Sequence, residues 1–343
     1  MDRYRTGRWS RREFLGGVAL TGTAGLVGLN VGPASADPPP ETTTIRLIND
    51  PAFGVICYAP QFVAAQLLRG EGFTDVRYSK LLQGSEPKTL AAGWADLSAA
   101  FVGDLITALD AEAPIVVLTG LHGGCYELVG SERVRTIHDL KGKKVALSGV
   151  LGVGPHTFLS AMLAYVGLDP RKDVIWVPLP PPAAIRAFAE GKVDAIFAFP
   201  PAPQELRTKK IGHVLLSTAK DPPWSQYFCC MVGARREFVQ KYPAATKRAL
   251  RAILKANQLC TLEPERSARM LVDQKFTSNY DYTLQVLKDV RYDTWRDYDP
   301  EETLRFHALR MREIGAIKST PQKIIARGTD WRYVNELKKE LKG

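Results

Sequence analysis

Hydrophobic residues between 44 and 217 alternate between two spacings. Short apolar runs typical of strands are followed by segments with the spacing of a helix. In the first unit the successive pairs are TIRLIND and YAPQFVAAQLLRG, DVRYSKL and EPKTLAAG, ADLSAAF and DLITALDA, and APIVVLTGL and YELVG. A second unit starts at TIHDLKGKKVALSG and continues through PHTFLSAMLAYVGL, DVIWVPL, PPAAIRAFAEG, KVDAIFAF and PAPQELRTK to HVLLST. This rhythm predicts an α/β fold with mostly parallel sheets covered by helices.

The pattern becomes mainly helical from Arg235 onward. Pro243 stands where a first-turn proline belongs, and Leu250, Ile253 and Leu254 follow at helical spacing. The basic residues of this stretch fall mostly on the other faces, which predicts a solvated surface. Two α/β units and a helical return predict two lobes, with a ligand beyond the carboxyl ends of the strands.

The first 36 residues have the pattern of an export signal. Twin arginines, Arg11 and Arg12, precede an uncharged glycine-rich stretch from 15 to 31 and the small residues of 34–36. That stretch is short and weakly apolar for a bilayer span. We therefore expect twin-arginine export, cleavage after Ala36 and a periplasmic protein.

Charge and length add two constraints. Cleavage would leave 307 of the 343 residues, enough for two lobes, and would lower the formal net charge from +10 to +7. The basic residues are dispersed, and no Lys/Arg tract is interleaved with aromatic residues. No nucleic-acid partner is predicted, and the protein is expected to be a monomer.

A glycine-rich loop, SGVLGVGPHTFLSAML (148–163), connects a predicted strand to a predicted helix. Free N–H groups at a helix N-terminus attract anions and polar ligand atoms. The dinucleotide fingerprint fails here because Thr157 stands where its third glycine belongs. The loop is therefore a candidate ligand contact without a nucleotide signature.

Several stretches between about Thr44 and about Asp273 resemble one family. They are PQFVAAQLLRGEGF, GWADLSAAFVGDLITAL, PIVVLTGLHGG, TIHDLKGKKVAL, LAYVGLDPRKDV, AFAEGKVDAIFAFPP and EFVQKYPAATKRALRAILKA. Together they resemble the periplasmic substrate-binding proteins of nitrate/taurine/sulfonate-type ABC importers, which are related in fold to thiamine-pyrimidine synthases. The resemblance implies a two-lobed type II periplasmic-binding-protein clamp, each lobe a mostly parallel sheet flanked by helices, with a helical C-terminal part. Lobe 1 would comprise 44–128 plus 232–343, and lobe 2 would comprise 129–231.

On such a clamp the candidate ligand contacts lie in loops at strand ends. Aromatic residues there would stack on an organic ligand, and His122 would donate to an anion or titrate near neutral pH. A structural role stays open for Phe53 and His122, and Asp104 is expected to be an N-terminal helix charge. The predicted ligand-binding residues are Asn49, Phe53, Tyr58, Phe101, Gly103, His122, Gly123, Gly154, His156, Thr157, Phe199 and Tyr227.

The five cysteines form an odd set without a C-x-x-C motif. Cys57 and Cys260 are expected to act as small buried hydrophobic residues. Cys125, Cys229 and Cys230, with His122 and His156, leave disulfides or a metal site open, but their spacing matches no known ligand set. No metal and no cofactor is predicted.

These features predict a periplasmic solute-binding component of an ABC import system. It would capture a small organic anion or heteroaromatic compound (sulfonate, nitrate, aromatic acid or pyrimidine class) and deliver it to a permease in the inner membrane. The sequence contains no H-E-x-x-H, G-x-S-x-G or paired-carboxylate motif, so no catalytic residue and no enzyme activity is expected. The alternative is an exported metal- or cofactor-dependent enzyme related to thiamine-pyrimidine synthases, and its motive is the twin-arginine signal together with Cys229–Cys230 and His122.

Overall fold

The structure is a computed structural model that describes residues 37–49, 56–152 and 154–341. The chain divides into the units Met1–Asp37 and Pro38–Gly343, and the described strands and helices all belong to the second unit. The predicted export signal, with its twin arginines and its cleavage site, lies outside the described residues, as does Phe53.

Two small sheets come from the first part of the chain and one returning strand. Strands β1 (Thr44–Ile48) and β2 (Asp75–Ser79) pair in parallel. Strand β10 (Cys230–Arg235) lies between β3 (Leu97–Phe101) and β4 (Ile115–His122) and is antiparallel to both. The residues of β3 and β4 are buried throughout, as their continuous apolar sequences predict.

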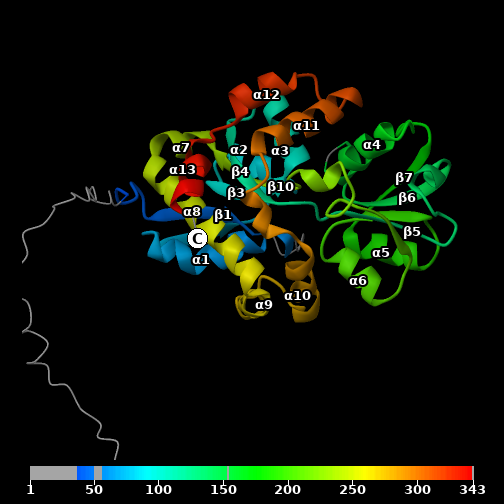
Figure 1. Cartoon of the computed structure of the whole chain (residues 1–343), viewed down its shortest axis with the longest axis horizontal. Coiled ribbons are helices and arrows are strands. Elements are labelled where there is room, and N and C mark those ends of the chain that lie inside the picture. Colours follow the sequence, from blue (N-terminus) through cyan, green and yellow to red (C-terminus); the bar gives the residue numbers. More distant parts are fainter. Residues whose placement is uncertain (1–36, 50–55, 153, 342–343) are drawn as a thin grey trace, which may run out of the picture. The chain divides into compact units, whose positions relative to one another are not determined.

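A five-stranded sheet comes from residues 127–217. Its strands lie in the order β7-β6-β8-β5-β9. They are β5 (Glu127–Gly130), β6 (Lys143–Ser148), β7 (Val174–Leu179), β8 (Ala195–Ala198) and β9 (His213–Ser217). In Figure 1, helix α4 (Pro155–Tyr165) lies on one side of this sheet, and α5 (Pro181–Ala189) and α6 (Ala202–Thr208) lie on the other.

The α/β fold is confirmed, but the sheets are mixed rather than mostly parallel. The pairs β6·β7 and β6·β8 are parallel, whereas β5 is antiparallel to both β8 and β9. Strands β3 and β4, joined by a helix, run in the same direction as the strand–helix rhythm predicts. The returning β10 is inserted between them in the opposite direction, which the local pattern did not reveal.

Helices cover these sheets and form the C-terminal part of the chain, as predicted. Those before β10 not yet named are η1 (Ile56–Tyr58), α1 (Ala59–Gly70), α2 (Glu86–Ala91), α3 (Val102–Asp110), η2 (Ile137–Leu140) and η3 (Trp224–Gln226). After β10 come α7 (Arg236–Lys241), α8 (Pro243–Leu262), α9 (Pro264–Asp273), α10 (Tyr280–Asp289), η4 (Tyr292–Trp295), α11 (Pro300–Glu313), α12 (Pro321–Gly328) and α13 (Arg332–Glu340). None of the described helices is both long and apolar enough to cross a membrane.

The basic side of α8 is not the solvated surface that its sequence predicts. The Arg251 side chain is only 11% exposed and pairs with Glu71 at 2.9 Å and Glu340 at 2.8 Å. Lys255 also pairs with Glu71, at 3.1 Å. This side of α8 packs against α1 and against the buried Glu71 that follows α1. Helical periodicity in the sequence does not predict such a tertiary contact.

Candidate functional site

A cavity of about 200 Å³ lies where strand ends and helix N-termini meet. Its walls come from the starts of α1, α2, α3 and α4, from the ends of β3 and β6, and from the loops after β4 and β8. Larger hollows of about 430 and 510 Å³ lie beside α5, and another of about 510 Å³ lies beside α6 and β9 with Cys125 in its lining. The convergence of strand ends with helix N-termini makes the first cavity the candidate site.

Aromatic rings form one wall of the cavity. Tyr58, Phe101, Tyr126 and Phe199 all line it. The Phe101 ring meets Tyr126 edge-on at 5.4 Å between centroids, and Tyr126 meets Phe199 edge-on at 5.8 Å. Rings held by such neighbours offer a rigid surface on which a flat ligand can stack.

Two carboxyl groups face the same space. Glu86 and Asp104 lie in the first turns of α2 and α3, where partial positive charge favours an acid. Burial and the nearby Asp104 nevertheless raise the pKa of Glu86 to about 8, and burial raises the pKa of Asp104 to about 6. Near neutral pH, Glu86 is therefore mostly a protonated acid that can donate a hydrogen bond.

The glycine-rich loop lines the cavity at both of its ends, at 148–150 and at 154–155. Gly154, with φ of 50°, lines the space, and its N–H donates to Oδ1 of Asp104 at 2.9 Å. The Thr157 hydroxyl donates to the Gly154 carbonyl at 2.9 Å. Nδ1 of His156 accepts from the Gly152 N–H at 3.1 Å, and its ring packs on Trp176. The protein itself thus occupies the polar groups that the sequence assigns to a ligand.

The ligand-binding residues predicted from the sequence fall into two groups. Among those described, Tyr58, Phe101, Gly154 and Phe199 line the cavity. The residues outside its lining are Asn49, Gly103, His122, Gly123, His156, Thr157 and Tyr227. Gly103 acts indirectly: an added Cβ would lie 2.5 Å from the Phe101 ring, so glycine is needed for that ring to lie where it does.

The remaining residues of that group have other partners. Tyr227 stacks on Phe306 at 4.1 Å between ring centroids. The backbone N–H of Asn49 donates to the Ser79 carbonyl at 3.0 Å, and that of Gly123 donates to the Arg291 carbonyl at 3.2 Å. These contacts give each residue a structural role that does not involve the cavity.

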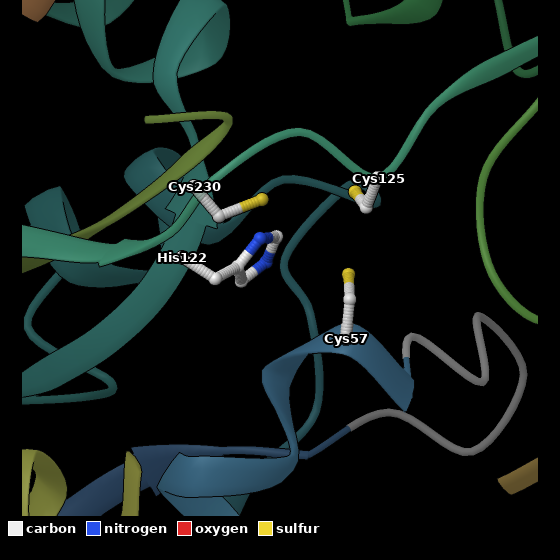
Figure 2. Close-up of side chains that lie close together, drawn as sticks. All are labelled: Cys57, His122, Cys125 and Cys230. Carbon is white, nitrogen blue, oxygen red and sulfur yellow. The ribbon is translucent and has the colours of Figure 1, made fainter. Parts of the chain in front are cut away.

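A cluster of thiols lies at the cavity, and the sequence indicated it only in part, because Cys57 was not grouped with Cys125, Cys230 and His122. Figure 2 shows the side chains of Cys57, His122, Cys125 and Cys230 pointing toward a common centre. One ligand atom from each lies within 4.8 Å of the others, and all four residues are buried. Cys57 lies just before α1, His122 ends β4, Cys125 follows β4 and Cys230 opens β10. The spacing of these residues in the sequence does not indicate the cluster, because the four residues come from three separate segments of the chain.

Backbone pairing between β10 and β4 brings two of these four residues together. Cys230 lies opposite His122 in the β10·β4 register, and the Cys229 N–H donates to the His122 carbonyl at 3.0 Å. Sγ of Cys229 lies 3.4 Å from Sγ of Cys125. His156, which the sequence grouped with these residues, lies elsewhere, against Trp176.

The cluster has an uneven charge distribution. Burial favours the neutral thiol, but contacts with Cys125, Cys230 and His122 hold the pKa of Cys57 well below its usual value. Burial lowers the pKa of His122, yet its contact with Cys57 reverses the shift and leaves that pKa raised. Burial also raises the pKa of Cys125 and of Cys230 well above the usual value. These shifts favour the thiolate at Cys57 and the protonated imidazole at His122 more than at an ordinary cysteine and histidine.

Comparisons with known proteins agree with the resemblance seen in the sequence. Residues 127–272 match the model of the NMT1-like family. The taurine-binding periplasmic protein of Escherichia coli is 27% identical over 180 residues, which cover 52% of this chain and 55% of that protein. The nitrate/nitrite binding protein NrtA of Nostoc is 29% identical over 119 residues, covering 33% of this chain and 26% of that one. The matched part thus spans about half or less of these relatives.

Solved structures decide the fold. The nitrate-binding protein NrtA of Synechocystis aligns with a TM-score of 0.73 at 18% identity, over 88% of this chain and 90% of that one. The chain has the periplasmic-binding-protein fold. The alkanesulfonate-binding protein SsuA of Xanthomonas axonopodis, bound to MOPS, aligns with a TM-score of 0.65 at 19% identity, over 85% and 99% of the two chains. Periplasmic-binding-protein architecture, predicted from the sequence, is thereby confirmed.

Proposed function

We propose that this protein is the solute-binding component of an ABC import system, that it works in the periplasm and that it has no catalytic activity. The observation that carries the proposal is the cavity at the converging strand ends, in a fold shared with solute-binding proteins. Relatives described as taurine-binding and nitrate-binding support a role in solute capture. Twin-arginine export, cleavage after Ala36, a monomeric state and a permease partner in the inner membrane belong to the same proposal.

The cavity favours a neutral heteroaromatic solute over an anion. No Lys or Arg is found among the described residues that line it, whereas two carboxyl groups and four aromatic rings are. A sulfonate or nitrate would place its charge near the Asp104 carboxylate without a basic side chain to offset it. A flat heterocycle would stack on the rings, accept a hydrogen bond from protonated Glu86 and donate one to Asp104.

Ligand screening tests this proposal. The purified protein is titrated calorimetrically with pyrimidines, aromatic acids, taurine, an alkanesulfonate and nitrate. We expect saturable binding of a pyrimidine-class compound and none of nitrate. Binding of the sulfonate alone would overturn the ligand class but keep the role in solute capture. If none of these compounds binds at millimolar concentrations, the proposed role in solute capture is overturned.

The pH dependence of affinity separates a neutral solute from a cationic one. The groups facing the Glu86 carboxyl are Asp104 on α3 and Cys57 and Tyr58 in η1, just before α1. A neutral ring nitrogen that accepts from Glu86 loses its donor as pH rises through about 8, so its affinity should fall there. Glu86→Gln keeps an N–H donor and should remove this fall. An affinity that instead rises between pH 6 and 8 would indicate a cationic solute.

The two-lobed organisation remains part of the proposal, with lobe 1 as 44–128 plus 232–343 and lobe 2 as 129–231. The hydrogen bond from Gly154 to Asp104 would then join one lobe to the other at the edge of the cavity. Small-angle X-ray scattering with and without the identified solute tests closure. A smaller radius of gyration with solute is expected, and an unchanged scattering curve would contradict a clamp that closes on its ligand.

A further inference from the structure

Nothing in the proposed function explains why three thiols and an imidazole meet at the inner wall of the cavity. Cys57, Cys125 and Cys230 are each at most 7% exposed, and His122 is fully buried. Scattered buried cysteines would serve equally well as small apolar residues. Here three sulfur atoms and one ring nitrogen, carried by three separate segments, converge.

The histidine is set to act as a ligand. Its Nδ1 lies 2.6 Å from the Gly123 carbonyl, which can only accept, so Nδ1 carries a hydrogen and donates. In the neutral ring Nε2 then holds a free lone pair. Nε2 is buried and has no hydrogen-bond partner among the described residues. An imidazole fixed through one nitrogen and open at the other is how metal-binding histidines are held.

The spacing of the four donors suits a small ion. In a tetrahedral zinc site with bonds to sulfur of about 2.3 Å, the sulfur atoms lie about 3.8 Å apart. The donor atoms here lie within 4.8 Å of one another, so small side-chain rotations would bring them to bonding distance. Three cysteines and a histidine are one of the ligand sets of tetrahedral zinc, and soft sulfur donors disfavour magnesium and calcium.

We propose that Cys57, Cys125, Cys230 and His122 form a binding site for one Zn²⁺ ion at the inner wall of the cavity. Three of the ligands line the cavity, which gives the ion a path to the site from solution. Cys229 lies outside the set of four, but its sulfur is 3.4 Å from that of Cys125. It is a supporting neighbour rather than a ligand. The proposal does not depend on the identity of the solute.

Zinc titration of the reduced, metal-free protein against a chromophoric chelator is the direct test. One Zn²⁺ per chain is expected. Cys57→Ser, Cys125→Ser and Cys230→Ser should each weaken zinc binding by more than roughly 100-fold, since even the loss of a supporting neighbour weakens metal sites by about 10–100-fold. Cys229→Ser should retain one zinc at moderately lower affinity.

Cys260→Ser is the matched control, because Cys260 is a fully buried cysteine of α8 outside the cluster. It should bind zinc as the unmodified protein does. Cobalt(II) added to the unmodified protein provides a second measurement that needs no variant. Thiolate-to-cobalt charge-transfer absorption and the intense visible bands of a tetrahedral site are expected, and X-ray absorption should count three sulfurs and one nitrogen.

Three results would overturn the proposal. One is reduced protein that binds no stoichiometric zinc and gives no cobalt charge-transfer band. Another is zinc binding that survives every cluster substitution. The third is a Cys125–Cys229 disulfide in protein isolated without reductant, together with a reduced form that does not bind zinc. In that case the thiols form a redox pair rather than a metal site.

Discussion

Glu86 is a carboxylic acid in a place that disfavours its charge. Its ordinary pKa near 4.5 rises to about 8 through burial and the nearby Asp104, so the folded protein holds a proton that the unfolded chain has already released. Between these two pH values the folded state binds more protons than the unfolded state. The free energy of unfolding therefore falls as pH rises through this window.

Replacing Glu86 by Gln should remove this pH dependence. Glu86→Gln mimics the protonated acid, so its advantage over the unmodified protein should grow from pH 5 to pH 8 by at most about 1.4 kcal/mol per pH unit. Urea unfolding at several pH values measures it. Glu132→Gln is the control, because that carboxylate is 82% exposed, and it should leave the profile unchanged. Parallel profiles for Glu86→Gln and the unmodified protein would contradict the raised pKa.

At the scale of elements, the start of α3 supports the aromatic wall. Gly103 lies in the first turn of this helix, directly under the Phe101 ring that ends β3. Without a side chain at 103, the ring can lie against the helix and face the cavity. The helix start and the cavity wall are thus one packing unit.

Gly103→Ala should disturb that unit. The new Cβ would lie 2.5 Å from the Phe101 ring, and overpacking of this kind costs about 1–3 kcal/mol. We expect a lower urea midpoint and, once a solute is known, weaker binding by calorimetry. The matched control is Gly70→Ala in α1, where no atom lies within 4 Å of the added Cβ. If the two variants proved equally stable and bound solute equally, Gly103 would not position the ring.

The elements themselves were largely predictable from the sequence, and the site was predictable only in part. Apolar runs and helical spacing located the strands and helices because burial imposes those periods locally. Phe101 and Phe199 were found because ligand loops follow strand ends. Cys125, Cys230 and His122 were named as a possible metal site, but Cys57 was not, because its meeting with them depends on long-range packing of η1 against the ends of β4 and β10, which no local pattern carries. The signal was that each cysteine also lies next to a strand or helix end.

At the scale of the whole molecule, the thiol cluster joins segments that are far apart in the chain. Cys57 precedes the first helix, Cys125 follows the fourth strand and Cys230 opens the strand that returns from the five-stranded sheet. An ion held by all of them would bind the folded chain more tightly than the unfolded one. Zinc should therefore stabilise the fold as a whole rather than one element.

Adding Zn²⁺ at a hundred times its dissociation constant should raise the free energy of unfolding by about 2.7 kcal/mol. Thermal unfolding of the metal-free and zinc-loaded protein measures this, with a chelator added last to reverse the shift. Cys260→Ser should keep the full increment, whereas Cys57→Ser should lose it, because the ion would then no longer tie the start of α1 to β4 and β10. The same increment in Cys57→Ser as in the unmodified protein would place the stabilising ion at another site.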